Sequence, residues 1–535
     1  MLYLDFAKKT NDSHHNNKFM SFKQCTTNFY LISLISCSLI FSSCSSSEFE
    51  YNIESQLNPY KISPLTALLQ ISTERPCRAS IKVIGDSPIE QAFETYSDSL
   101  SIPVVGLYPD TENKVVVTLN YEEGQIIDTV KIRTKRLPSK FPSIEINKID
   151  RSAMEAGLHG CDIHFANHGT FQSIPMIFDD QGAIRWYLDL SFHGKMVSPF
   201  QRLKDGTILM VGRQVIYELD MLGNITKQTT IDSNYGMHHD VLELPDGTLL
   251  ICVGKRNAYI DLDGEQVQSD SDFIILYDRK NDKILKEWDL AQHLDVSRND
   301  LNFFRKGDWL HMNGLAYDER DRSIVVSGKN QGLIKISWDD ELKWIMSPTR
   351  NWGKAGRDGK GFDTNQFLLT AVNSDGKPYA NNVQEGSESA DDFDFIWGPH
   401  APKFLPNGNL LVFDNGAYRN FDKLNIYSRA VEYKIDEDAK TVTQEWQYGK
   451  ERGQELFSSI VSDADHLKNT NNILVTSGFL KPSGEHSAKI VEVDYATGKE
   501  VFEATLLYKN ENGNRSGGWG QSDILYRSER LDLKY

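Results

Sequence analysis

The sequence has little that would build long helices. Sustained helical periodicity is rare across its 535 residues, and short apolar runs ending in Asp-Gly or Asn-Gly pairs dominate, with 37 glycines and only 17 prolines. Such runs are typical of strands joined by tight turns, so we expect a mostly β protein. The length exceeds what one small core requires, which favours one large domain accompanied by a smaller one.

Positive charge is also scarce. The chain carries 58 lysines and arginines against 75 aspartates and glutamates, a net charge of -17 with neutral histidines. A surface of this sign repels a phosphate backbone, so nucleic acid is excluded as an expected partner. The sequence also has no Gly-rich loop of the kind that binds nucleotide phosphates. It therefore does not favour an enzyme that uses a nucleotide as the donor of a transferred group.

Cysteines are few. The six are Cys25, Cys37, Cys44, Cys77, Cys161 and Cys252. The first three fall in one apolar N-terminal segment, and the other three are odd in number and far apart, so the sequence predicts no disulfide framework. Cys252 lies inside the apolar run "LLICV", where we expect a buried core residue.

The N-terminal run "NFYLISLISCSLIFSSCSSSEFE" is too short for a comfortable membrane span and has the apolar core of a secretory signal. Its "IFSSC" resembles a bacterial lipobox, with Phe41 in place of the usual leucine and Cys44 as the lipidated first residue of the mature protein. We expect residues 1–44 to be a signal peptide with a lipobox ending at Cys44, and translation to begin at Met1 or Met20. An uncleaved anchor helix is the alternative. The protein is therefore expected in the bacterial cell envelope, lipid-anchored at the periplasmic or outer-membrane surface.

Composition divides the rest of the chain into a tether and two domains. Residues 45–60 are polar and are expected to be a tether. Residues 61–140 contain "LLQIST", "ASIKVIG", "LSIPVVGLY", "KVVVTLNY" and "DTVKIRTK", spaced like the strands of a small β-sandwich. The segment "LPSKFP" reads as a linker into a larger domain at residues 141–535.

The larger domain repeats a unit of four strands. Five copies align on their first turn, at "FQRLKDGTILMVGR", "HHDVLELPDGTLLICVGK", "HMNGLAYDERDRSIVVSGK", "HAPKFLPNGNLLVFDNG" and "DADHLKNTNNILVTSG". A repeated four-stranded unit is typical of a propeller blade. We expect "SDILYRSERLDLKY" to supply the first two strands of a sixth blade that residues 160–190 complete, because such closure removes exposed edges. The sequence thus predicts an all-β fold, a six-bladed β-propeller after a small N-terminal β-sandwich.

Three histidines occupy the same register of this unit. His239, His311 and His400 begin the first strand in three successive copies, and first strands line the central channel of a propeller. Asn313 lies two residues after His311 and so faces the same side. The second strand ends in a glycine and a cation in three copies, at Arg213, Lys255 and Lys329. The register therefore predicts a site for a small anion at one channel mouth.

Several other readings of these residues stay open. A single histidine on a strand is as well explained by a structural hydrogen bond, which we expect for His164, His168, His238, His466 and His486. His238 should point away from His239 by strand alternation, and Arg213 and Lys255 are expected to be rim residues. Three histidines could instead hold a transition metal, although no fourth histidine matches the register and Lys329 would oppose a metal. We expect no metal and no cofactor. A neutral histidine could also attack an anionic group as a nucleophile.

At "HHDVLELPDG", "DWLHMNGLAYDERDRSIVVSGKNQGLIKI" and "GPHAPKFLPNGNLLVFDNG" the chain resembles the bacterial arylsulfate sulfotransferases, over residues 61–535. The resemblance implies an envelope transferase that moves a sulfuryl group from a phenolic sulfate ester to a phenol by a ping-pong route through a sulfohistidine, without the nucleotide donor PAPS. It implies that His400 is sulfated and that His311 and Asn313 bind the sulfuryl oxygens or protonate the leaving phenolate. His239 corresponds to the third catalytic histidine, with His238 as the alternative.

The chain departs from the family at two points. Lys329 stands where the family usually has arginine, which keeps the charge but loses the two-pronged donor, and there is no close cysteine pair. We expect the insertion at residues 347–395, with Trp352 and Phe367, to form a lid and phenol-binding wall. The expected partners are a phenolic sulfate donor, a phenol acceptor and the membrane through the lipid anchor; a homodimer is also open. The alternatives are a histidine-metal propeller enzyme such as an oxygenase, and a ligand-binding propeller lipoprotein without catalysis.

Overall fold

The computed structural model describes residues 49–167, 169–193, 196–300, 306–422, 426–481, 486–509 and 520–533. The chain divides into residues 1–49 and one compact unit at residues 50–535. The expected signal peptide and lipobox, with Cys44, lie outside the described residues. In the described ranges, no helix has the length and apolar character needed to cross a bilayer.

The first domain is built around one long strand. Its strands are β1 (Tyr51–Leu57), β2 (Ala67–Val83), β3 (Ile89–Ala92), β4 (Ser97–Val104), β5 (Glu112–Tyr121) and β6 (Gly124–Arg133). The first half of β2 pairs with β1 and β4, and its second half pairs with β3 and β5. Buried residues alternate with outward-facing ones over much of β2, as expected when only one face packs on a core.

The tether expected at residues 45–60 is wrong over β1. Residues 51–57 pair in register with residues 67–73, so they belong to the domain. Ile53 and Leu57 pack against its hydrophobic core, while most of the other side chains of β1 are exposed. A strand at a sheet edge needs only a few apolar residues, and for this reason its composition resembled a linker.

The larger domain consists, among the described residues, of six sheets of four or five strands. The first sheet consists of β12 (Phe200–Arg202), β13 (Ile208–Val211), β14 (Val215–Leu219) and β15 (Ile225–Thr230). The second consists of β16 (Tyr235–Glu243), β17 (Leu249–Lys255), β20 (Phe273–Asp278) and β21 (Lys283–Asp289). The third consists of β22 (Met312–Asp318), β23 (Ser323–Gly328), β24 (Gly332–Ser337) and β25 (Leu342–Met346). A hairpin of β18 (Tyr259–Leu262) and β19 (Glu265–Gln268) is inserted in the second sheet.

The other three sheets contain added strands. The fourth sheet consists of β27 (Pro399–Phe404), β28 (Leu410–Asp414), β29 (Arg429–Asp436) and β30 (Thr441–Tyr448), with β26 (Thr370–Ala371) added. The fifth consists of β31 (Asp463–His466), β32 (Ile473–Leu480), β33 (Ser487–Val493) and β34 (Glu500–Leu507), with β7 (Ser143–Ile149) added. The sixth consists of β35 (Ile524–Leu531), β8 (Leu158–Asn167), β10 (Met176–Phe178) and β11 (Ile184–Tyr187), with β9 (Thr170–Ser173) added. The short helices are η1 (Leu290–Gln292), η2 (Thr364–Phe367), α1 (Asn381–Gln384), η3 (Arg419–Phe421) and η4 (Lys450–Glu455).

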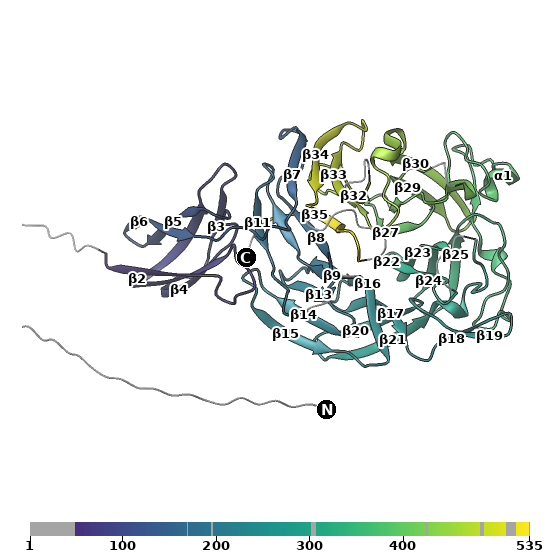
Figure 1. Ribbon diagram of the computed structural model, residues 1–535, viewed down its shortest axis with the longest axis horizontal. Helices are drawn as coiled ribbons and strands as arrows, with labels where there is room; N and C mark the ends of the chain where they lie inside the picture. The colour runs from purple at the N-terminus through teal and green to yellow at the C-terminus, as the bar shows by residue number, and fades with distance from the viewer. Residues whose placement is uncertain are drawn as a thin grey trace, which may run out of the picture. The chain divides into compact units, whose positions relative to one another are not determined.

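These sheets are arranged as the blades of a propeller. Figure 1 shows β16, β22, β27 and β35 nearest a common centre and β15, β21, β25, β30 and β34 at the periphery. Neighbouring first strands are in contact, β16 with β22, β22 with β27, and β27 with β31. The predicted all-β propeller with an N-terminal β-domain is confirmed, and the six sheets favour a count of six blades, which stays a prediction.

The two ends of the larger domain interlock. β35 pairs with β8, so the C-terminal segment completes a sheet begun near residue 158, as expected. The expectation that this segment supplies two strands is wrong: residues 524–531 form one continuous strand with a bulge and no turn. A second pairing, which the sequence did not predict, closes the outer edge of the preceding sheet. There β7 pairs with β34. Both pairings cover edges that would otherwise be open.

Candidate functional site

The three histidines of the repeat lie at bulges in the first strands of their sheets. The pairing register shifts between Met237 and Val241, between Met312 and Gly314, and between His400 and Lys403. His239, His311 and Ala401 have left-handed φ angles of 52°, 49° and 49°. Each such angle costs a non-glycine residue about 1–3 kcal/mol, and bulges of this kind re-aim side chains. Left-handed backbone at or directly after a histidine in three neighbouring blades marks this mouth of the channel as a functional site.

His400 is buried and held by hydrogen bonds on both ring nitrogens. Its Nδ1 lies 2.5 Å from Asn415 Oδ1, and its Nε2 lies 3.0 Å from Asn313 Nδ2. Asn415 Nδ2 donates to two carbonyls, Ser458 O and Val461 O, so its Oδ1 must be the atom that faces the histidine. Nδ1 therefore carries the proton, and Nε2 presents its lone pair.

Asn313 is fixed in the same way. Its Nδ2 donates to Pro399 O at 2.9 Å, and its Oδ1 lies 2.8 Å from the hydroxyl of Ser327. The side chain is fully buried. The second N–H of this amide is thus directed at His400 Nε2, where an anionic group bound to that nitrogen would meet a hydrogen-bond donor.

His311 forms a pair with a carboxylate. Asp308 Oδ2 lies 2.7 Å from His311 Nδ1, which holds the proton on that nitrogen and leaves Nε2 for other chemistry. The rings of His311 and His239 are 5.0 Å apart between centroids. Asp308 was missed by the sequence reasoning because it precedes the strand and lies outside the repeat register.

His238 and His239 are in contact, contrary to the expectation that His238 points away. Their Nδ1 atoms are 2.9 Å apart and their ring centroids 5.1 Å apart. The bulge between Met237 and Val241 breaks the alternation on which the expectation depended. Both rings are therefore part of the site, and His239 is the one that reaches His311.

Burial keeps two of these imidazoles, those of His239 and His400, neutral. Burial, followed by the charges of Lys329 and His311, lowers the pKa of His400 to about 3. Burial and the neighbouring histidines also lower the pKa of His239 well below its usual value. Burial lowers the pKa of Lys329, and the charge of Asp308 partly offsets that effect. Neutral imidazole is the form with a free lone pair, so nucleophilic chemistry is available at neutral pH.

Lys329 lies next to the turn that precedes His400. Its backbone N–H donates to His311 O at 3.1 Å, and a Cβ at Gly398 would lie 3.8 Å from both Lys329 Cγ and Asn415 Cβ. Gly398 has a φ of 69°, which also favours glycine. The structure therefore brings Lys329 together with His239, His311, Asn313 and His400, the residues predicted from the sequence.

The remaining candidates stand apart from this site. Lys255 pairs with Glu287 at 2.7 Å and Arg213 is exposed, as expected for rim residues. Three of the histidines expected to be structural have local partners, His164 with Ser173, His466 with Asn471 and His486 with Ser522. His168 lies outside the described residues.

Parts of the insertion at residues 347–395 pack on outer strands, and its role as a lid stays a prediction. Trp352 is buried, donates its indole N–H to Pro348 O and stacks under Arg298 at 4.4 Å. Phe367 ends η2, which packs on the outer strand β25, while β26 pairs with the outer strand β30. The expectation of a phenol-binding wall from Trp352 and Phe367 is wrong, because Trp352 belongs to a hydrophobic core cluster and Phe367 packs against it.

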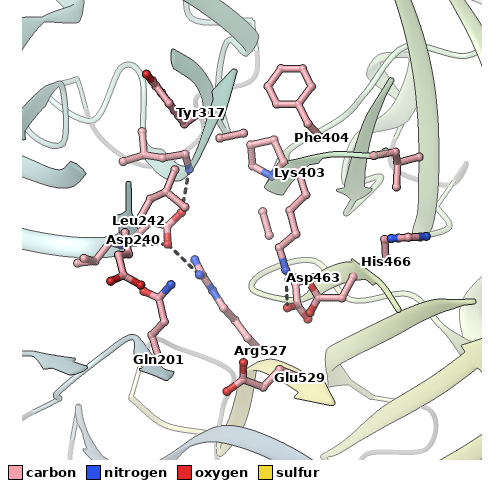
Figure 2. A pocket seen from close by; sticks show the side chains of 18 of the residues that line it. Gln201, Asp240, Leu242, Tyr317, Lys403, Phe404, Asp463, His466, Arg527 and Glu529 are labelled. Atoms are coloured by element: carbon pink, nitrogen blue, oxygen red, sulfur yellow. Dashed lines mark hydrogen bonds and ion pairs between the residues drawn. The ribbon is translucent and has the colours of Figure 1, made fainter. Parts of the chain in front are cut away.

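A different apolar cluster borders the histidines. It consists of Phe171, Val461, Ile524 and Tyr526, with Met196, Ile460 and Phe479 partly buried around them. The Tyr526 ring lies 6.5 Å from that of His239, and Val461 O accepts from Asn415. Beyond the histidines, the first strands continue along a cavity of about 710 Å³, shown in Figure 2.

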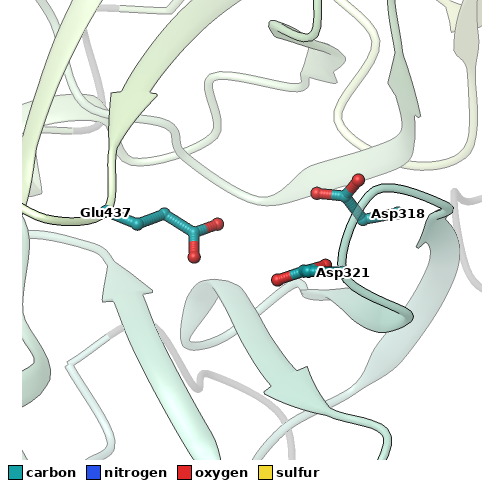
Figure 3. A group of neighbouring side chains, drawn as sticks. All are labelled: Asp318, Asp321 and Glu437. Carbon is teal, nitrogen blue, oxygen red and sulfur yellow. The ribbon is translucent and has the colours of Figure 1, made fainter.

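Carboxylates gather at one further place, between two blades. Asp318, Asp321 and Glu437 form the one group in the described ranges whose three ligand atoms lie within 4.8 Å of one another (Figure 3). Lys335 Nζ already lies among them, 2.8 Å from Asp318 and 3.2 Å from Asp321, and in contact with Glu437. Arg320 also pairs with Asp318 and Lys343 with Asp321, so three cations balance the three carboxylates and the group is a structural ion-pair cluster. Among the described residues of the histidine site, no three such ligand atoms lie within 4.8 Å of one another.

Two family models match the chain. One described as Arylsulfotransferase (ASST) matches residues 148–515, and one described as Arylsulfotransferase Ig-like domain matches residues 54–135. Two proteins named Arylsulfate sulfotransferase AssT, from Escherichia coli O6:H1 and from Lelliottia amnigena, are each 28% identical to the chain, over 85% of it and 90% of their own length.

Solved structures resemble the chain more distantly. A protein of unknown function from Bacteroides caccae is 12% identical with a TM-score of 0.39, over 70% of this chain and 98% of that one. The WD40 domain of Toxoplasma gondii coronin is 12% identical with a TM-score of 0.28, over 70% and 88% of the two chains. These TM-scores are too low to support a fold assignment. The assignment of the fold depends on the strand pairing of the chain itself.

Proposed function

Because the chain belongs to the arylsulfotransferase family, we propose that it transfers a sulfuryl group from a phenolic sulfate ester to a phenolic acceptor, with His400 as the nucleophile. One observation carries the assignment to His400. Its Nδ1–H is fixed on Asn415, and its unprotonated Nε2 faces the amide of Asn313. A buried imidazole locked in this tautomer is an activated nucleophile with a hydrogen-bond donor already beside it.

In the first half-reaction, His400 Nε2 attacks the sulfur of the donor. The N–S bond forms as the bond from sulfur to the aryl oxygen breaks, and the electron pair leaves with the phenolate. Positive charge develops on the ring, and the short hydrogen bond from Nδ1–H to Asn415 Oδ1 stabilises it. Asn313 Nδ2 and the ammonium of Lys329 hold the sulfuryl oxygens.

His311 moves the proton. In its protonated form it gives a proton to the leaving phenolate, and Asp308, at 2.7 Å, stabilises that form. In the second half-reaction an acceptor phenol gives its proton back to His311 while its oxygen attacks sulfur. The N–S bond breaks, and His400 returns to the neutral tautomer. Because the donor is already an activated ester, no nucleotide takes part.

The aryl groups of donor and acceptor pack on the apolar cluster beside His239. Its partly buried members Met196, Ile460 and Phe479 present apolar surface next to the histidines. Burying an aromatic ring on such surface contributes binding energy and excludes water from the sulfohistidine. Exclusion of water favours transfer over hydrolysis.

The proposal extends to the location of the enzyme. The lipobox-like "IFSSC" supports attachment of a lipid at Cys44 and residence in the cell envelope. A radiolabelled fatty acid should be incorporated into the expressed protein and be absent from Cys44→Ser. Equal label in both proteins would remove the anchor from the proposal without affecting the chemistry.

Steady-state kinetics test the transfer reaction. With 4-nitrophenyl sulfate as donor, phenol as acceptor and no nucleotide, we expect parallel double-reciprocal lines, which indicate a ping-pong route. His400→Ala should lower kcat by about 10⁴-fold or more, because a covalent nucleophile is lost. His466→Ala, which removes a histidine bonded to Asn471, serves as the control and should retain activity. Intersecting lines, or a His400→Ala variant within a few-fold of wild type, would contradict the proposal.

A further inference from the structure

The cavity behind the histidines is separate from the site described above. Asp240 follows His239 and Ala401 follows His400, and both line the cavity. None of the imidazoles and amides assigned to the sulfuryl site is among its lining residues in the described part of the chain. A volume of about 710 Å³ is within the range of small-molecule sites.

One side of the cavity is apolar and the other is charged. Tyr317 and Phe404 lie on one side in Figure 2, and Arg527, Asp463 and Glu529 lie on the other. Phe200, Leu242 and Leu405 add apolar surface. Such a cavity suits a molecule with an aromatic or aliphatic body and one charged end.

The sign of the charged end follows from the lining residues. The acidic ones are Asp162, Asp240, Glu243, Asp318, Glu319, Asp463, Asp465 and Glu529, and the basic ones are Arg320, Lys403, Arg527 and Arg530. The cations already have carboxylate partners: Arg527 pairs with Asp240 at 2.8 Å, and Lys403 contacts Asp465. The excess of carboxylates favours a cation over an anion.

Three buried acceptor atoms of the lining residues make no hydrogen bond within the described residues: Asp162 Oδ1, Gln201 Oε1 and Glu529 Oε1. The Asp162 side chain is 1% exposed; its Oδ1 has His164 Nε2 at 3.4 Å, beyond a good hydrogen bond, while Oδ2 accepts from Phe200 N. Glu529 on β35 pairs with Gly160 on β8, two residues before Asp162 on the same face. The acceptors therefore come from neighbouring strands and need donors.

We propose that this cavity binds a small organic ammonium ion, whose N–H groups donate to the Glu529 carboxylate and whose apolar body packs on Phe200, Tyr317 and Phe404. A bare divalent ion fits less well, since these carboxylates do not bring three ligand atoms within 4.8 Å in the described ranges. An ammonium ion on a carbon chain needs hydrogen-bond acceptors at one end only, and its apolar body can pack on the aromatic rings at the other. The inference does not depend on the proposed sulfuryl transfer.

Binding of a cation should release protons. Burial, opposed by Lys403, Arg202 and Arg527 and assisted by Asp463, raises the pKa of Glu529 to about 7. A bound ammonium favours the ionised carboxylate and lowers that pKa. Near pH 7 the complex therefore binds fewer protons than the free protein, and affinity rises as the pH increases through 7.

Calorimetric titration of the purified full-length protein with phenethylamine tests the proposal. This probe has no phenolic hydroxyl, so it cannot accept a sulfuryl group on oxygen. We expect binding with net proton release at pH 7, seen as a heat that depends on the ionisation enthalpy of the buffer. Its uncharged and anionic counterparts, phenethyl alcohol and 3-phenylpropionate, should bind roughly tenfold or more weakly.

Variants locate the bound probe. Glu529→Gln should weaken phenethylamine binding roughly tenfold or more and abolish the proton release. Glu319→Gln, at an exposed position on the cavity rim, is the matched control and should bind normally. His400→Ala should also bind normally. The proposal is overturned if wild type shows no binding, if the alcohol binds as tightly as the amine, or if His400→Ala rather than Glu529→Gln loses binding. The comparison of phenethylamine with phenethyl alcohol and 3-phenylpropionate uses the wild-type protein alone. It therefore tests the proposal even if Glu529→Gln fails to fold.

Discussion

Replacing Asp308 by asparagine should separate the two chemical roles of the site. The carboxylate lies 2.7 Å from His311 Nδ1 and accepts its proton in hydrogen bonding. An asparagine of the same size can donate to Nδ1 instead, which favours the other ring tautomer and no longer stabilises the protonated ring. General acid–base catalysis contributes about 10²- to 10⁴-fold, so we expect a loss in that range for steps that need proton transfer.

The loss should depend on the leaving group. 4-Nitrophenolate is a weak base and departs without a proton, so the burst of 4-nitrophenolate from Asp308→Asn should be close to wild type. Phenolate is more basic and needs the proton from His311, so release of phenol from phenyl sulfate should fall by most of the expected factor. Rapid-quench measurement of both donors at equal enzyme concentration gives the two numbers directly.

A matched substitution shows whether the effect is local. Asp340 makes the same kind of contact with His293, at 2.8 Å, away from the site. Asp340→Asn should leave both donors unaffected. Equal losses for the two donors in Asp308→Asn, or no loss with phenyl sulfate, would refute the role assigned to the Asp308–His311 pair.

Four further predictions follow from the same geometry. Asn415→Leu removes the acceptor for His400 Nδ1–H, so steady-state kcat should fall about 10- to 100-fold with little change in KM, provided that thermal unfolding shows a folded protein. Because the pKa of His400 is lowered to about 3, the 4-nitrophenolate burst should stay constant from pH 7 to about 4 and fall only as protonation removes the lone pair; an acid limb near pH 6 would disagree. Lys329→Arg should lower the KM for donor in initial-rate assays and Lys329→Met should raise it, because the planar fork holds two sulfuryl oxygens and the thioether holds none. Trp352→Ala should cost about 3–5 kcal/mol in urea unfolding without changing the ratio of hydrolysis to transfer, whereas a raised ratio would support the lid.

The repeat could be read from the sequence because each unit has its own turn chemistry. Asp-Gly and Asn-Gly pairs follow the first strand at nearly constant distance, and so they fix the register of His239 and His400. Once the unit is a blade, the first strands must meet at one channel. Local pattern and closure of the ring are sufficient for this prediction, and His239, His311 and His400 lie together in the structure.

The site within that register could not be read as directly. The bulge between Met237 and Val241 adds two residues to its strand, which turns His238 toward His239 and defeats simple alternation; the bulge between Met312 and Gly314 adds one. Asp308 comes before its strand, and Asn415 comes after one. Neither position follows the repeat, so their contacts with the histidines depend on tertiary packing.

Polar composition misled at the edges of the fold. The sequence predicts a tether over β1 because Ile53 and Leu57 are its main apolar contacts with the core. The insertion around Trp352 is expected to be a lid because the reaction needs water to be excluded and the insertion carries aromatic residues. Trp352 belongs to a hydrophobic core cluster and Phe367 packs against it, and the apolar surface beside the histidines comes from Tyr526 and its neighbours instead.

The central claim is that His400 carries the sulfuryl group between the two substrates. Intact-mass analysis after brief incubation with an aryl sulfate and no acceptor tests it most directly, followed by peptide mapping and addition of phenol. The account predicts a gain of one SO₃ that maps to His400, is absent in His400→Ala and disappears when phenol is added. A protein that turns over the donor with no change in mass, or a sulfuryl group that maps to another residue, would contradict it.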